Sequence, residues 1–94
     1  MAIHFVELSL KAQKQLRRVP RYIADKLQEW VHAVDQYSLE EVRKRPGYHD
    51  EALKGHRAGQ RSIRLSRGYR AIYIIKEQKA IEFINVEEVH LHDY

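Results

Sequence analysis

The sequence contains no cysteine among its 94 residues. This absence excludes disulfide bonds and thiolate metal sites, and it is compatible with a reducing cytoplasm. No apolar run approaches the roughly 20 residues that a membrane-spanning helix needs. The first residues, MAIHFVEL, also lack the basic region and long apolar stretch of a secretory signal. We therefore expect a cytoplasmic protein with no membrane partner.

Only two prolines and four glycines interrupt the chain, and no repeat, linker or low-complexity segment is visible. Hydrophobic residues make up 44% and charged residues 32%, which is typical of a soluble globular protein rather than a disordered one. A length of 94 residues is enough for one modest hydrophobic core. We expect a single domain over residues 1–94.

Positive charge is concentrated between Lys54 and Arg70, in the run KGHRAGQRSIRLSRGYR. This run contains no acid and six basic residues, namely Lys54, Arg57, Arg61, Arg64, Arg67 and Arg70. The rest of the chain has 11 basic and 13 acidic residues, so the net charge of +4 is attributed to this segment. A local positive field suggests a polyanionic partner, with phosphate as the first candidate.

The C-terminal sequence HLHDY adds groups that can transfer protons. His90 and His92 lie two positions apart and would share a face of an extended chain, and an unperturbed histidine titrates at about pH 6.5. A frayed terminus and a two-histidine metal site are the alternatives. No third metal ligand is evident, so we expect neither a metal nor a cofactor. Together with cations that hold phosphate, these groups suggest RNA cleavage.

Apolar residues at helical spacing predict two main helices after a short opening strand at residues 2–8. Ser9 matches the N-cap of the first helix, and a proline ends that helix. The second helix has the clearest pattern, with apolar residues three or four apart at Ile23, Leu27, Trp30, Val31 and Val34. Ser38 and Glu41 have the spacing of a capping box, which predicts a third short helix as far as Arg45.

Alternation of polar and apolar residues predicts strands in the second half of the chain. These strands cover residues 61–65, 69–75 and 80–89, with a loop over 48–60 and turns at 66–68 and 76–79. Gly68 can supply a positive φ in the first turn if one is needed. The predicted order is strand, helix, helix and then a three-stranded antiparallel meander, which gives an α+β fold.

A basic amphipathic helix is the alternative for residues 54–70, because the basic residues are also three or four positions apart. Such a helix would suit a nucleic-acid groove or a membrane surface. Gly55, Gly59 and Gly68 argue against it, since each glycine costs a helix interior about 1 kcal/mol. We therefore prefer the strand and hairpin.

Three short runs carry a family signature: EALKG at 51–55, SIRL at 62–65 and YRAIY at 69–73, with Gly59 between the first two. With these runs and its C-terminal HLHDY, the chain resembles the RelE/ParE superfamily of bacterial type II toxins. The best match is to the ribosome-dependent RNases of the RelE, YoeB and HigB type, whose size and element order fit nearly the whole chain.

The resemblance implies a microbial RNase-like fold, a curved antiparallel sheet with two N-terminal helices. It implies cleavage of mRNA in the ribosomal A site, without metal, by attack of the ribose 2′-oxygen. Translation would be inhibited and growth arrested. It also implies a co-expressed antitoxin protein that wraps the toxin and covers the active groove, and a toxin–antitoxin complex that binds its own operator DNA.

The resemblance assigns roles to single residues of the segment 51–73. Glu51 stands where YoeB-like members place a proposed general base, and Arg70 matches the arginine that stabilises phosphate. Arg64 occupies a position that is basic in RelE-like members. Arginine suits phosphate because its planar fork binds two oxygens and never loses its charge. The alternatives are an ion pair with a strand glutamate for Arg70 and a solvated strand face for Arg64.

The C-terminal residues depart from the family pattern. Tyr94 matches a C-terminal tyrosine and could stack on a base or orient the phosphate. In YoeB-like members a histidine directly precedes that tyrosine, whereas Asp93 intervenes here. Cleavage needs an acid for the departing 5′-oxygen, and both His90 and His92 are candidates for it.

A second group of basic residues is expected to bind RNA rather than to take part in the chemistry. It consists of Lys54, His56, Arg57 and Arg61, in or beside a glycine-containing loop. As a set these residues resemble a rim that follows phosphates, although any one of them could be ordinary surface.

Two other functions remain open from the sequence. One is a non-enzymatic ParE-type toxin that has the same fold and inhibits DNA gyrase. The other is an inactive relative that only binds RNA. A pure binder has no need of a combined acid and base set, so these residues favour the nuclease.

Overall fold

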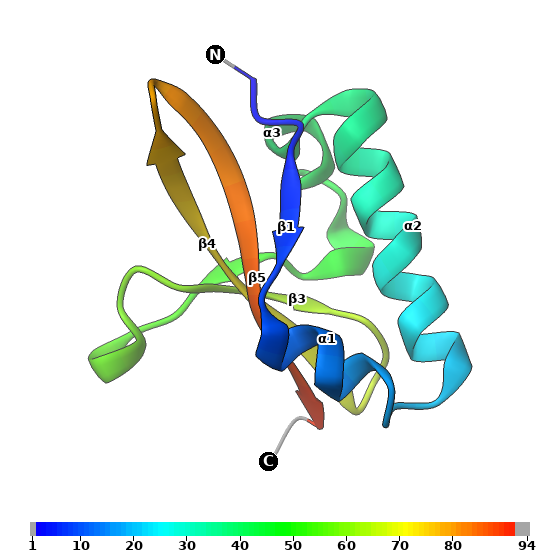
Figure 1. Ribbon diagram of the computed structural model, residues 1–94. Coiled ribbons are helices and arrows are strands. Elements are labelled where there is room, and N and C mark those ends of the chain that lie inside the picture. The colour runs from blue at the N-terminus through cyan, green and yellow to red at the C-terminus, as the bar shows by residue number, and fades with distance from the viewer. Residues whose placement is uncertain (1, 92–94) are drawn as a thin grey trace.

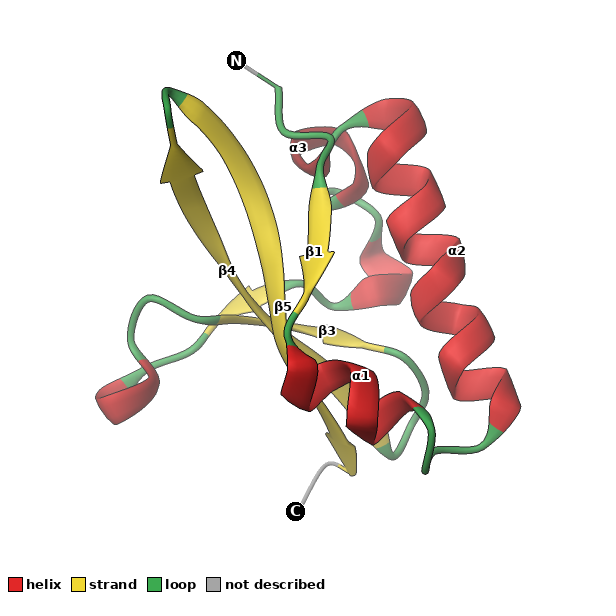
Figure 2. Cartoon of the chain, in the orientation of Figure 1, coloured by secondary structure: helices red, strands yellow, loops and turns green. Residues whose placement is uncertain are grey.

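The computed structural model describes residues 2–91 and shows a twisted sheet with the long α2 packed along one side (Figure 1). The helices are α1 (Leu10–Leu16), α2 (Arg21–Tyr37) and α3 (Leu39–Val42), with 3₁₀ turns at Pro46–Tyr48 and Gly55–Arg57. The strands are β1 (Val6–Leu8), β2 (Glu51–Ala52), β3 (Arg61–Arg64), β4 (Tyr69–Gln78) and β5 (Ile81–Leu91). Figure 2 distinguishes the helical and strand segments, and together they confirm the predicted α+β fold.

The sheet has the strand order β1-β5-β4-β3-β2. β3, β4 and β5 form the predicted antiparallel meander. β2 extends the meander at one edge by antiparallel pairing with β3, and β1 pairs in parallel with β5 at the other edge. The long β4–β5 hairpin therefore lies at the centre of the sheet.

Local capping and apolar packing account for the two main helices. Ser9 Oγ accepts a hydrogen bond from the Ala12 amide at 3.0 Å, as expected of an N-cap. α2 turns its apolar stripe towards the sheet, and Trp30 in that stripe is fully buried. The Trp30 ring lies 5.4 Å from the ring of Tyr73 on β4, which joins the helix layer to the sheet.

Two boundaries in the first half of the chain differ from the prediction. The opening strand is only Val6–Leu8, because just these residues pair with β5. α3 ends at Val42 rather than at Arg45. Its start is as predicted, since Ser38 Oγ accepts a hydrogen bond from the Glu41 amide at 3.3 Å.

In the second half, the predicted loop over 48–60 contains β2, which at two residues is too short to show alternation. β4 and β5 both run further than predicted and meet in a tight turn. Lys79 and Ala80 have φ values of 53° and 63° there, as a two-residue hairpin turn requires. Gly68 has no positive φ, so the permissive backbone of glycine is not needed at that turn.

The two faces of the sheet differ in character. Apolar side chains of β3, β4 and β5 enter the hydrophobic core on one face, namely Ile63, Ala71, Tyr73, Ile84, Val86 and Val89. The register of β4 against β5 shifts by one residue between Ile72 and Tyr73, which forms a bulge. The opposite face carries polar and charged residues, and the candidate site lies there.

Candidate active site

Strand pairing places four of the predicted site residues, Glu51, Arg64, Arg70 and His90, in two neighbouring rows on the polar face. Residues opposite each other on adjacent strands share a face of the sheet. The first row crosses four strands as Glu51, Ser62, Ile72 and Glu88. The second crosses three strands as Arg64, Arg70 and His90. Side chains two positions apart along a strand also share a face, so the two rows are adjacent.

Arg70 is the centre of this arrangement. Its Nη1 donates a hydrogen bond to Ser62 Oγ at 2.6 Å and lies 3.4 Å from Glu51 Oε1. The Arg70 side chain is 14% exposed and that of Glu51 is 59% exposed. The guanidinium is therefore held in a fixed place by a buried hydroxyl, while the carboxylate beside it remains open to solvent.

His90 lies directly opposite Arg70, on β5. Its Nδ1 is 2.9 Å from the Leu91 carbonyl oxygen, which can only accept, so Nδ1 carries the hydrogen. Nε2 is buried and has no hydrogen-bond partner in the part of the chain that the structure describes. His90, Glu51 and Arg70 line one hollow of about 170 Å³ together with Leu53, Arg57, Ser62 and Ile72.

Arg64 is the second arginine of its row and lies opposite Arg70 on β3. Its Nη1 is 3.4 Å from Nε2 of His49, in the loop before β2. It does not line the hollow around Arg70. Two guanidinium groups on adjacent strands repel each other, which favours an anion between or above them.

The basic loop between β2 and β3 is anchored at Arg57. Its Nη1 lies 3.2 Å from Glu88 Oε2 on β5, and Lys11 Nζ of α1 lies 3.2 Å from the other oxygen. Burial acts to raise the pKa of Glu88, but hydrogen bonds from Lys11 and Arg57 outweigh it and hold the pKa below its usual range. Lys54 and His56 in the same loop are exposed.

A comparison with family models decides the family. The model of the ParE toxin of type II toxin–antitoxin systems, parDE, matches residues 6–88. The chain belongs to this ParE toxin family. It is thus a toxin of a type II toxin–antitoxin system, and the predicted RelE/ParE superfamily is confirmed. The match is to ParE, whereas the sequence signature resembled RelE, YoeB and HigB most.

Solved structures of other toxins share the fold of this ParE-family chain. The YoeB/ParE toxin from Agrobacterium tumefaciens has a TM-score of 0.68 and 17% identity, covering 95% of this chain and 99% of that chain. YafQ from E. coli strain BL21(DE3) has a TM-score of 0.67 and 17% identity, covering 93% and 91%. The YoeB dimer from Staphylococcus aureus has a TM-score of 0.67 and 17% identity, covering 99% and 100%. No curated protein sequence matches the chain significantly.

Arg61 has a structural contact in this ParE-family toxin that the sequence analysis did not foresee. Its Nε lies 2.7 Å from Oδ1 of Asp50, and the Tyr73 hydroxyl donates to the other Asp50 oxygen at 2.5 Å. The Asp50 side chain is only 1% exposed. Arg61 lies two residues before Ile63 in β3, and side chains two positions apart in a strand share a face. This spacing could have placed Arg61 on the core face of the sheet. Nothing local in the sequence marks Asp50.

His92 and Tyr94 lie outside the described residues, so their predicted roles stay predictions. Within residues 2–91, no group of three or more histidine, aspartate or glutamate side chains could hold a metal ion. No helix in the same range is long and apolar enough to cross a membrane.

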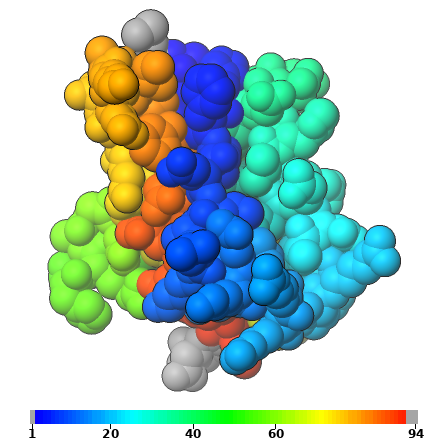
Figure 3. Space-filling model, viewed as in Figure 1, coloured from blue at the N-terminus to red at the C-terminus, as the bar shows by residue number. Residues whose placement is uncertain are grey.

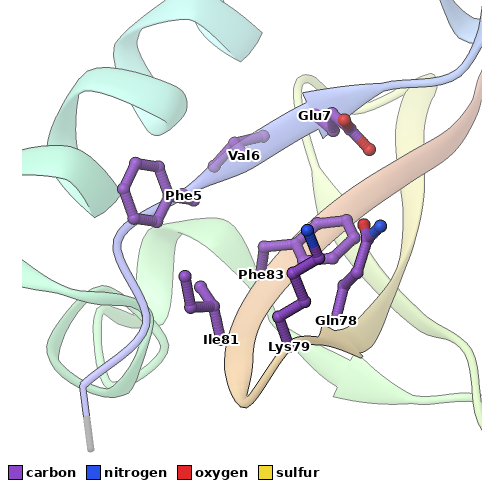
Figure 4. Close-up of a pocket in the computed structure, with 7 residues that line it drawn as sticks. All are labelled: Phe5, Val6, Glu7, Gln78, Lys79, Ile81 and Phe83. Atoms are coloured by element: carbon purple, nitrogen blue, oxygen red, sulfur yellow. The ribbon is translucent and has the colours of Figure 1, made fainter.

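A larger hollow, of about 410 Å³, lies between β1 and the end of the β4–β5 hairpin (Figure 4). Phe5, Ile81 and Phe83 supply its apolar lining, and Lys79 is its single cation. It lacks an arginine or histidine that could bind phosphate or transfer a proton near neutral pH. The hollow around Arg70 is therefore the candidate active site of this ParE-family toxin.

Proposed function

We propose that the protein is a ribosome-dependent endoribonuclease that cleaves mRNA in the A site. The observation that carries the proposal is the position of Arg70, fixed by Ser62, with Glu51 at one side and His90 opposite it on the next strand. A cation flanked by two groups that can exchange protons matches what phosphodiester cleavage needs.

The reaction would begin when a phosphate of the RNA binds Arg70 and replaces Glu51 as its partner. Glu51 is then free to accept the proton of the ribose 2′-hydroxyl, whose oxygen attacks phosphorus. The bond from phosphorus to the 5′-oxygen breaks, and that oxygen takes a proton from His90 or His92. The products are a 2′,3′-cyclic phosphate and a 5′-hydroxyl. Each step uses a side chain of this chain, so the proposal requires no metal or cofactor.

The partners follow from the same proposal. Solved neighbours include the YoeB–YefM toxin–antitoxin complex from Staphylococcus aureus and the toxin–antitoxin complex RelBE2 from Mycobacterium tuberculosis. By analogy, we propose that the present toxin binds a cognate antitoxin and that its targets are the ribosome and mRNA. We also propose that the toxin–antitoxin complex binds operator DNA. A cytoplasmic location follows from these targets.

A second candidate function is inhibition of DNA gyrase without cleavage. The match to the ParE family model favours it. In that case the ion pair of Arg70 and Glu51 would be a structural feature of the sheet rather than part of a reaction.

Expression of the chain alone, with mapping of mRNA 5′ ends on translated and untranslated copies of one transcript, tests both. We expect codon-phased cuts on the translated copy only. Arg70→Ala should reduce cleavage about 10²- to 10³-fold, as for loss of one donor to a reacting anion. Lys76→Ala, on the exposed part of the same strand, is the matched control. Arrest without cuts, with gyrase supercoiling lost in vitro, would favour the second candidate.

A further inference from the structure

A second basic segment lies at the start of the chain. Between Glu7 and Asp25 there is no acid and there are five basic residues, namely Lys11, Lys14, Arg17, Arg18 and Arg21. Outside this segment and residues 54–70, six basic residues remain against 13 acidic ones. The positive charge of the molecule therefore has two sources, this segment and residues 54–70.

The fold gathers part of this segment along one side of α1. Lys11 and Lys14 of α1 and Arg18 in the turn after it line a hollow of about 340 Å³ together with Gln15. Gln15 fixes the helix to the sheet, because its Oε1 accepts a hydrogen bond from the Val89 amide at 2.6 Å. The cations thus project from a rigid support beside β5.

Lys14 and Arg18 differ from Arg57, Arg61 and Arg70 in their acidic partners. Arg57, Arg61 and Arg70 each pair with a carboxylate. Among residues 2–91, Lys14 and Arg18 form no ion pair. Like charges held together without counter-charges create a field that attracts a polyanion.

The basic side of α1 continues into the candidate active site through Glu88. Lys11 of α1 and Arg57 of the β2–β3 loop bind the two oxygens of this carboxylate. In the space-filling view, the blue surface of α1 and the green surface of the loop lie on either side of the orange-red β5 (Figure 3). One phosphate backbone could therefore contact both basic segments.

A membrane surface is a poorer fit to this side of the molecule. Lipid-binding helices need an exposed apolar face. Ala12 is buried and Leu16 packs against the core, which leaves Leu10 as the exposed apolar residue of α1. We propose that the surface formed by Lys11 and Lys14 of α1 and by Arg18 after it binds the phosphate backbone of a structured RNA outside the candidate active site. The choice of RNA among polyanions rests on the proposed function.

Fluorescence anisotropy with a labelled, 2′-O-methylated RNA hairpin tests this proposal over a series of salt concentrations. Such RNA cannot be cleaved through its 2′-oxygen, so binding is measured whether or not the chain is a nuclease. The double variant Lys14→Gln/Arg18→Gln should bind more weakly. The slope of log K against log salt should fall by about 0.7 to 0.9 for each phosphate that the variant no longer neutralises. Lys76→Gln/Lys79→Gln, on the β4–β5 hairpin, removes the same charge and is the control.

A reduced slope in the first variant and an unchanged slope in the control would support the proposal. Equal slopes in the wild type and both variants would overturn it, as would an equal reduction in the two variants. Binding to phosphatidylserine vesicles without binding to the hairpin would also overturn it. Circular dichroism of both variants checks that they are folded, which is expected because the substituted side chains lie at the surface of the molecule.

Discussion

Asp50 is the residue whose replacement should most damage the fold beside the candidate site. Its carboxylate is buried and accepts hydrogen bonds from Arg61 Nε and the Tyr73 hydroxyl. These two hydrogen bonds join the loop before β2, which carries Asp50, to Arg61 on β3 and Tyr73 on β4. Asp50→Asn keeps the shape of the side chain but removes its charge and one of its two acceptors, so a buried donor loses its partner.

The expected loss follows from these contacts. Breaking a buried ion pair by removing one partner costs about 3–5 kcal/mol. Arg61 is 24% exposed, so water can replace part of what it loses. We therefore expect a free energy of unfolding lower by about 3 kcal/mol, at the lower end of that range. For a domain of this size, each kcal/mol lowers Tm by about 4–8 °C, so Tm should fall by roughly 12–24 °C.

Urea unfolding followed by circular dichroism measures this loss. The matched control is Glu51→Gln, the next residue, whose carboxylate is 59% exposed and paired with Arg70. An exposed pair contributes little, so this variant should change the free energy of unfolding by less than about 1 kcal/mol. If Asp50→Asn also costs less than about 1 kcal/mol, the buried pair does not stabilise the fold in the way argued here.

Two further predictions concern titration and the proton donor. Burial raises the pKa of Tyr73, and the hydrogen bond and negative charge of Asp50 raise it further. The neutral phenol therefore stabilises the fold fully below about pH 10, where the unfolded tyrosine begins to ionise, and this stabilisation falls as the pH rises further. Tyr73→Phe should show a smaller alkaline loss of stability in urea titrations, and an identical loss in both proteins would contradict this cause. If His90 is the acid, His90→Ala should abolish mRNA cleavage while His92→Ala retains it; the reverse result would assign the role to His92.

Much of the fold could be predicted because its signals are local. The N-cap at Ser9, the apolar stripe of α2 and the alternation in β3 and β4 depend on neighbouring residues. The parallel pairing of β1 with β5 joins distant segments and leaves no such signal. β2 is too short for any period, and only its pairing with β3 defines it.

The candidate site was predictable only in part for the same reason. Alternation predicts that Arg64 faces away from the core, and the resemblance selects Arg70. Only the register of the strands brings His90 beside Arg70. The charge of Arg61 suggests the basic rim, whereas its position two residues before the buried Ile63 places it on the core face of β3. The contact of Arg57 with Glu88 depends on how the loop folds over the sheet, which no spacing in the sequence specifies.

The pairing of β1 with β5 also sets the order of events during synthesis. Val6 pairs with Ile84, so β1 waits for a partner until β5 has been made. At about 5–20 residues per second, this wait lasts roughly 4–16 s. β5 also supplies His90, so the strand that closes the sheet is the one that completes the candidate site. A toxin synthesised only as far as β4 can therefore assemble neither the complete sheet nor the candidate site.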